Sequence, residues 1–242
     1  FSGKHIKIFI DGVPQEGVGA SFGLNNIPVN LAERIEVYRG VVPVQFGADA
    51  MGGVVNIVTN SVREGWNLDA SYSYGSFNTH KSFINFGKVH RNGLKYELNI
   101  FQNYSDNNYT INAPVEDFET GSIEKKKLYS VERFNDTYHN EAATFKVGVV
   151  GKSWADRLML GIGLSQMYKE VQTGVRQEIV YGQKHRRSHS LMPSLEYGKR
   201  NLLFNGLDLS ASLNYNRNVS TNIDTASCKY NWFGETKKLN GR

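Results

Sequence analysis

The feature that most constrains this chain is an alternation of apolar and polar residues that recurs from residue 66 to residue 215. In the last run, Leu207, Leu209 and Leu213 occupy alternate positions, with aspartate, serine and asparagine between them. Successive residues of a strand point to opposite faces, so each run predicts a strand with one apolar and one polar face. We predict about seven such strands, at residues 66–74, 82–89, 94–100, 144–149, 158–165, 190–197 and 207–215.

The connections between these runs alternate in length. Residues 90–93 and 152–156 are short connections, whereas residues 105–139 and 171–187 are long ones. Outer-membrane barrels have tight turns at one end and longer loops at the other, which matches this alternation. The hairpin at residues 75–79 is short although it belongs with the long connections. A loop as long as residues 105–139 is uncommon in compact soluble domains and usually carries function.

Tyrosines lie near the ends of the apolar faces. They are Tyr72, Tyr74, Tyr96, Tyr104, Tyr168, Tyr197 and Tyr215. A membrane barrel gathers aromatic residues at its two interfaces, turns its apolar face to lipid and encloses its polar face. A soluble sandwich would turn both apolar faces into a shared core, and it is the alternative. We therefore predict a mostly β fold with the antiparallel, amphipathic strands of a transmembrane β-barrel, incomplete at about seven strands.

Composition excludes other classes. The 242 residues have a mean hydropathy of −0.44 and contain no apolar run of roughly 18 residues, so no transmembrane helix is expected. The net charge of +5 is spread along the chain, without the clustered basic face of a nucleic-acid binder. The single cysteine, Cys228, cannot form an intramolecular disulfide and indicates little about the redox compartment.

Residues 6–59 differ from the rest of the chain and predict a small α+β unit. A strand at residues 7–10 runs into an Asp-Gly turn signal, and a short helical turn is expected from Pro28 to Glu33. Strands follow at residues 34–39 and 51–59, the second rich in β-branched residues and suited to burial on both faces. The glycines before it provide a sharp reversal or a close backbone approach.

No catalytic or metal site is evident. The sequence has no phosphate-binding glycine loop, no cysteine cluster and no paired acid and base, so we expect neither an enzyme nor a cofactor. His185 and His189 have helical ligand spacing, but on a strand four residues span about 13 Å, too far to chelate one metal. The charges of residues 124–127 and 184–187 are expected to be solvated, or to pair with lipopolysaccharide phosphates if these loops face outward.

The opening segments at residues 8–14, 27–28, 33–40 and 46–59 form an ordered series that resembles the plug domain of TonB-dependent outer-membrane receptors. The residues that match the family's motifs are Asp11, Gly12, Pro28, Arg34, Glu36, Arg39, Gly40, Gly47, Ala48, Gly52, Gly53 and Asn56. The remainder resembles the start of the family's barrel in pattern. The resemblance implies two parts, the latter part of a plug at residues 1–60 and the first strands of the barrel at residues 61–242.

The resemblance also implies a function. The chain is expected in the bacterial outer membrane, in contact with its lipid. Ligand would bind to extracellular loops and the plug apex, and the TonB complex would pull on a segment upstream of the residues present. The expected cargo is a ferric siderophore or another metal chelate, with cobalamin or glycan import as alternatives. An all-β binding or adhesion domain with long recognition loops is a further alternative, and a soluble envelope enzyme the least favoured.

Polar contacts are expected to hold the plug against the wall, because a plug that moves when pulled needs contacts that can be broken. Arg34, Glu36 and Arg39 are charged residues of one plug strand. Glu97 and Glu196 both fall on the polar parity of their strands. We predict ion pairs between Arg34 or Arg39 and these two glutamates, against the simpler interpretation that the plug charges only solvate a strand edge.

Overall fold

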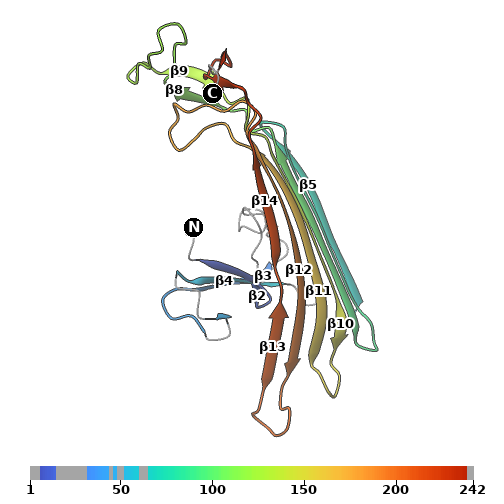
Figure 1. Cartoon of the computed structure of the whole chain (residues 1–242). Coiled ribbons are helices and arrows are strands. Elements are labelled where there is room, and N and C mark those ends of the chain that lie inside the picture. Colours follow the sequence, from blue (N-terminus) through green and yellow to red (C-terminus); the bar gives the residue numbers. More distant parts are fainter. Residues whose placement is uncertain (1–5, 15–31, 44–45, 48–51, 60–64, 239–242) are drawn as a thin grey trace.

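The computed structural model describes residues 6–14, 32–43, 46–47, 52–59 and 65–238. Most of them form one antiparallel eight-stranded sheet, here called the wall. Its strands, in order across the sheet, are β5 (Gly65–Gly75), β6 (Thr79–Val89), β7 (Leu94–Ser105), β10 (Tyr138–Val150), β11 (Arg157–Glu170) and β12 (His185–Lys199), followed by β13 (Leu209–Asn214) and β14 (Arg217–Ile223). Figure 1 shows the wall as a single curved layer.

The last two wall strands are two halves of one strand. β13 pairs with the end of β12 and β14 with its beginning, in a continuous register from Leu209 to Ile223. The interruption lies opposite Pro193, whose carbonyl accepts a hydrogen bond from the Tyr215 amide at 3.0 Å. A proline has no N–H to return that bond, so the ladder is incomplete there. With β13 and β14 counted together, the wall has the seven strands that the alternation predicts.

A second, four-stranded sheet lies on the concave side of the wall (Figure 1) and is here called the inner sheet. It contains β1 (Lys7–Ile10), β2 (Val13–Pro14), β3 (Ala32–Tyr38) and β4 (Val54–Thr59), in the order β2-β1-β4-β3. β4 lies between a parallel and an antiparallel neighbour. Its residues Val54, Val55, Asn56 and Ile57 are all buried, as predicted for a strand covered on both faces.

The helical turn predicted from Pro28 to Glu33 requires a correction. Ala32 and Glu33 belong to β3, because Ala32 pairs with Thr59 of β4 and the strand continues through a bulge to Arg34. The start of the predicted turn lies outside the described residues. The described part of the inner sheet is therefore all β, and the predicted boundary between residues 60 and 61 also lies outside the described residues and stays a prediction.

The long connections fold together above the wall and are here called the loop cap. It contains β8 (Thr110–Ala113), β9 (Tyr129–Glu132), β15 (Cys228–Tyr230) and β16 (Thr236–Lys238), which form two small hairpins (Figure 1). The loop cap has its own apolar core of buried side chains: Ala113, Val115, Val131, Val180 and Trp232. The long connection at residues 105–139 thus contains two short strands.

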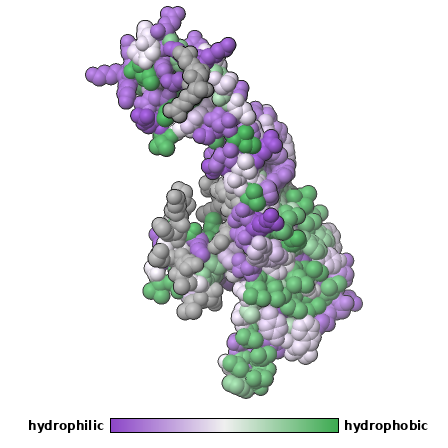
Figure 2. Space-filling view, viewed as in Figure 1, coloured by the Kyte–Doolittle hydropathy of each residue, from purple (hydrophilic) through white to green (hydrophobic). Residues whose placement is uncertain are grey.

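The two faces of the wall differ as the alternation predicts. The concave face contains buried polar groups such as Asn85, Lys146 and Glu196. The convex face exposes large apolar residues, among them Leu68 and Leu160 at 57% and 58% exposure. Figure 2 shows apolar residues gathered over the lower part of the wall and hydrophilic ones over the loop cap. Within the described ranges, we find no helix with the length and apolar character needed to cross a membrane.

Candidate functional site

Among the described residues, Asp11 makes a charged contact between the inner sheet and the wall. Asp11 and Gly12 form a two-residue hairpin between β1 and β2, with φ angles of 51° and 78°. Two positive φ angles define a type I′ turn, for which Asp-Gly is a preferred sequence. The turn carries the Asp11 carboxylate to 3.8 Å from Lys146 Nζ and 4.0 Å from Arg157 Nη2, both on the wall.

The two wall cations share a second carboxylate, that of Glu196 on β12. Lys146 Nζ donates to Glu196 Oε1 at 2.8 Å. Arg157 donates to Glu196 Oε2 through Nε at 2.9 Å and lies 2.7 Å from it through Nη2. The Lys146 and Glu196 side chains are only 7% and 10% exposed. Charge-assisted hydrogen bonds are strong where solvent is largely excluded, and removing one partner there leaves an unfavourable unpaired charge.

Gly161 makes the contact between Lys146 and Glu196 possible. Lys146 is on β10 and Glu196 on β12, so the lysine side chain must cross β11. A Cβ atom at Gly161 would lie 2.5 Å from Ser194 Oγ and 3.2 Å from Lys146 Cγ. Only a residue without a side chain leaves this path open, so the glycine determines the position of the lysine.

The charges of this cluster balance, but its two halves differ in strength. Asp11 and Glu196 are the carboxylates, and Lys146 and Arg157 the cations. The bonds within the wall are 2.7–2.9 Å long, whereas those to Asp11 are 3.8–4.0 Å and exceed hydrogen-bond range. The inner sheet can therefore separate from the wall while Glu196 still neutralises one of the two cations.

A hydrogen-bond network holds the Asp11 turn to the rest of the inner sheet. The Gly12 amide donates to Asn56 Oδ1 at 3.1 Å, and Asn56 Nδ2 donates to Glu36 Oε2 at 2.9 Å. Arg34 Nε donates to the other oxygen of Glu36 at 2.9 Å. The bond from Asn56, followed by that from Arg34, lowers the pKa of Glu36 below its ordinary 4.5. Five of the motif residues thus form one connected structure.

The glycines of the motif have backbone roles. Gly40, Gly47 and Gly53 have positive φ angles of 79°, 83° and 115°. A Cβ atom at Gly53 would lie 2.6 Å from the Tyr38 carbonyl oxygen, so β3 and the approach to β4 pack backbone to backbone there. Gly52 is exposed at the same turn. Pro28 and Ala48 lie outside the described residues.

The residues of the predicted plug-wall ion pairs have the following partners in the structure. Glu97 and Glu196 both lie on the concave face, as their parity predicts, but Glu97 pairs with Lys95 at 2.6 Å and Glu196 with the two wall cations. Arg34 binds Glu36 within the inner sheet, and Arg39 is exposed. The charged contact we find has the opposite sign from the predicted one, with the acid on the inner sheet and the cations on the wall. Pairs of Arg34 or Arg39 with a wall glutamate stay a prediction.

Sequence reasoning missed Lys146 and Arg157 as partners. Lys146 falls on the polar parity of its run, which was a usable signal, whereas Arg157 comes before the first alternating residue of its own run. Asp11 was recognised as a turn and motif residue only. Local sequence predicts neither that the Asp11 side chain points toward the wall nor the strand register that brings the two cations together.

Two buried side chains join the two long connections to each other, next to the ends of the wall strands. Gln172 Oε1 accepts hydrogen bonds from the amides of Phe134 and Asn135, at 2.6 and 2.8 Å. Asn135 Nδ2 donates to the carbonyls of Val171 and Lys184, at 3.0 and 3.2 Å. Gln172 is 1% exposed and Asn135 5%. These bonds fix the start of one long connection against the other, so both are held where they leave the wall.

The loop cap contains a cavity of about 410 Å³. It is lined by aromatic residues, Tyr181 and Tyr230, and by residues of both charges. Lys229 lies 2.5 Å from Glu116, and Lys125 lies 3.5 Å from Glu178. Two of the three cations that line the cavity, Lys125 and Lys229, are thus paired with acids, and Arg176 is the third. Within the described residues, no cluster of three or more His, Cys, Asp or Glu side chains is suited to hold a metal ion.

Residues 1–54 match the family described as TonB-dependent receptor plug domain. Solved structures match most of the chain at low identity. They include the siderophore receptor PiuA from Acinetobacter baumannii (TM-score 0.57, 14% identity, 89% of this chain and 29% of that one). The FrpB iron transporter from Neisseria meningitidis, F3-3 variant, matches with a TM-score of 0.55 and 15% identity, over 87% of this chain and 32% of that one. The open form of the ferric-catecholate import receptor Fiu from E. coli K12 matches with a TM-score of 0.54 and 13% identity, over 88% of this chain and 32% of that one. The chain thus spans about a third of the length of these structures, and the likeness shows a shared fold.

Proposed function

We propose that this chain, which carries the plug domain of the TonB-dependent receptors and shares their fold, serves in TonB-dependent uptake of an iron chelate across the bacterial outer membrane. The observation that carries the proposal is the contact of the inner sheet with the wall through the charged cluster around Lys146. A wall with a polar concave face and an apolar convex face fits a membrane barrel. The inner sheet is then the plug within it.

The iron chelate is proposed from the nature of the matched structures. These are described as a siderophore receptor, an iron transporter and a ferric-catecholate import receptor. The loop cap is the part of this chain where a ligand from outside would arrive first, because it lies at the end of the wall with the long connections (Figure 1). A ferric siderophore is the preferred cargo, and other metal chelates, cobalamin and glycans are the competing ones.

The charged cluster suggests how a pulled plug is released. Apolar packing would be lost only together with a large change in solvent-exposed area, whereas rehydration of the Asp11 carboxylate offsets much of the loss of an ion pair at 3.8–4.0 Å. The shorter bonds around Glu196 stay with the wall. Asp11 therefore serves as the releasable half of the contact, and the TonB complex would supply the force through a segment upstream.

Uptake measurements on cells that express the full protein test this proposal. Iron-starved cells are offered radiolabelled ferric siderophores of catecholate and hydroxamate type, with cobalamin and oligosaccharides as comparisons. Energy-dependent uptake of one ferric chelate, abolished in a strain without TonB, is the expected result. Uptake that does not depend on TonB, or uptake only of the comparison ligands, would contradict the proposal.

Asp11→Asn is the informative variant in the same assay. We expect it to bind the ligand as the unchanged protein does but to change the uptake rate, because asparagine preserves the turn and removes the releasable charge. Asp208→Asn is the matched control. It removes one carboxylate from the turn between β12 and β13, where Asp208 accepts a bond from the Asn201 amide at 3.0 Å.

A further inference from the structure

One row of polar side chains crosses the convex face of the wall, beside a row of apolar ones. Its members are opposite one another in the register of β6, β7, β10, β11 and β12: Ser82, Gln102, Glu141, Gln166 and His189. We call them the polar row. The next row toward the short turns is apolar and consists of Ile84, Ile100, Ala143, Leu164 and Leu191, here called the apolar row.

The polar row lies just below an aromatic one. Tyr104, His139 and Tyr168 are aligned one step closer to the loop cap, and the cationic Arg187 ends that row. Aromatic residues of membrane barrels lie at the level of the lipid headgroups. Two residues along a strand are about 7 Å apart, so the polar row lies at the depth where headgroups meet acyl chains.

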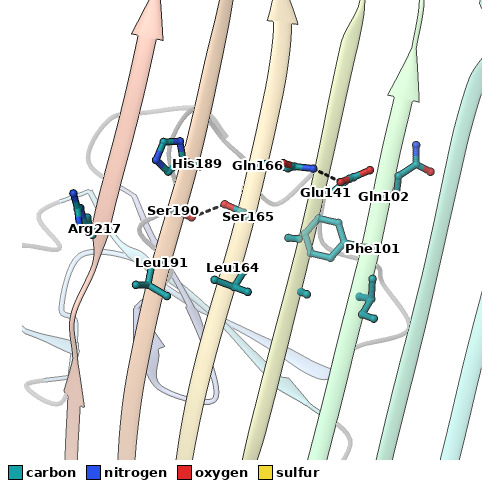
Figure 3. A pocket seen from close by; sticks show the side chains of 13 residues that line it. Phe101, Gln102, Glu141, Leu164, Ser165, Gln166, His189, Ser190, Leu191 and Arg217 are labelled. Atoms are coloured by element: carbon teal, nitrogen blue, oxygen red, sulfur yellow. Dashed lines mark hydrogen bonds between the residues drawn. The ribbon is translucent and has the colours of Figure 1, made fainter.

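A hollow on the convex face joins the polar and apolar rows. Its volume is about 720 Å³, and Figure 3 shows Gln166, His189 and Glu141 along its upper edge, with Leu164 and Leu191 below. Ala143 explains why the surface is hollow here. It stands between Ile100 and Leu164 in the apolar row and has only a methyl group where its neighbours have branched chains.

The charges around the hollow favour an anion. Arg217 lines it on β14, opposite Leu191 and so at the level of the apolar row (Figure 3). An arginine at this depth on a lipid-facing surface is unfavourable without a counter-charge. The one acid of the polar row, Glu141, already has partners within the wall. Gln166 Nε2 donates a hydrogen bond to its carboxylate at 2.5 Å, and His139 Nε2 lies 3.0 Å from it.

We infer that this hollow binds a phosphorylated, acylated sugar lipid of the membrane leaflet on the loop-cap side. The apolar row around Ala143 would receive an acyl chain, and Arg217 a phosphate. Gln102, Gln166 and His189 offer the donors and acceptors that sugar hydroxyls require. A glycerophospholipid shares the chain and the phosphate but lacks the sugar ring, so it uses only part of this surface. The inference rests on the proposed membrane location.

The test is lipid retention measured by native mass spectrometry on the full protein in detergent. The probes are diphosphoryl lipid A and phosphatidylglycerol, added in equal amounts. We expect lipid A to be retained preferentially. Retention should fall by about tenfold in Arg217→Gln, since the loss of one charge-assisted contact corresponds to roughly that factor. Ala143→Leu, which fills the hollow, should lower it to a similar extent.

Val147→Leu is the matched control, because it enlarges a residue on the same strand and the same face two rows away. It should retain lipid A as the unchanged protein does. Folding of each variant is checked by circular dichroism and by its melting temperature. Equal retention of both lipids, or unaltered retention in Ala143→Leu and Arg217→Gln, would overturn the inference. A protein that is monomeric and folded without detergent would overturn the membrane location as well, whereas loss of chelate uptake with lipid binding intact would contradict only the proposed function.

Discussion

Replacing Asp11 with asparagine tests whether the inner sheet is held to the wall by a weak charged contact. Asparagine tolerates the φ angle of 51° and suits the type I′ turn, so the variant removes a charge and preserves the backbone. Two unit charges 3.8 Å apart, as Asp11 and Lys146 are, attract by about 4 kcal/mol at an effective dielectric constant near 20. The lost hydration of the Asp11 carboxylate, only 12% exposed, offsets much of this attraction.

The expected net effect of Asp11→Asn is therefore a loss of about 1–2 kcal/mol in the free energy of local opening of β1 and β2. Glu196→Gln should cost more, about 3–5 kcal/mol, because it leaves the buried Lys146 and the half-buried Arg157 without their nearest carboxylate. Its effect should extend into β10 and β11, whereas that of Asp11→Asn should stay within the inner sheet. The contrast follows from the bond lengths, 2.8 Å to Glu196 against 3.8 Å to Asp11.

Hydrogen exchange followed by mass spectrometry on the full protein in detergent measures both effects, since peptides from residues 7–14 and 140–165 report on the two sheets separately. A double-mutant cycle with Lys146→Met should give a coupling free energy of about 1 kcal/mol to Asp11 and a larger one to Glu196. The reasoning is refuted if exchange at residues 7–14 is unchanged in Asp11→Asn, or if the coupling to Asp11 equals or exceeds that to Glu196.

Three further predictions concern single positions. Gly161→Ala should destabilise the wall by about 1–2 kcal/mol in urea unfolding, because its Cβ would meet Ser194 Oγ at 2.5 Å, and Ser194→Ala in the same chain should recover part of the loss. Trp232→Ala should cost about 3–5 kcal/mol locally, because Trp232 is 3% exposed; faster hydrogen exchange should be confined to the loop cap, and equal acceleration in the wall would contradict its separate core. Glu36 has a lowered pKa in the folded state, so its stabilising contribution is complete above its ordinary value of 4.5 and is lost as the pH falls through the lower folded value. Protection factors of the inner sheet, which correct for the intrinsic pH dependence of amide exchange, should therefore fall in acid, and Glu36→Gln should weaken that dependence.

Much of the wall could be predicted from sequence because its period of two is long and regular. The same parity placed Glu97 and Glu196 on the concave face correctly. The identity of their partners could not be predicted, because the bond from Lys146 to Glu196 crosses an intervening strand and depends on the register of two pairings and on Gly161. Local pattern carries no information on either register.

The loop cap shows a different limit. β8 and β9 have only four residues each, too few for alternation to stand out, and Val180 and Trp232 of the same core lie far along the chain. Such a structure is specified by long-range packing. The split of the seventh wall strand, in contrast, had a visible signal in Pro193, whose place in an alternating run hid its effect on the neighbouring strand.

That proline has a mechanical consequence. β2 packs beside β13, below the break, whereas β14 continues above it toward the loop cap. Because the ladder lacks one bond opposite Tyr215, a shear force applied to β13 by a displaced inner sheet can be absorbed by local twisting at this point. On the proposed function, the upper half of the strand should be insulated from that load, so that the residues it presents near the loop cap should keep their positions when the inner sheet is displaced.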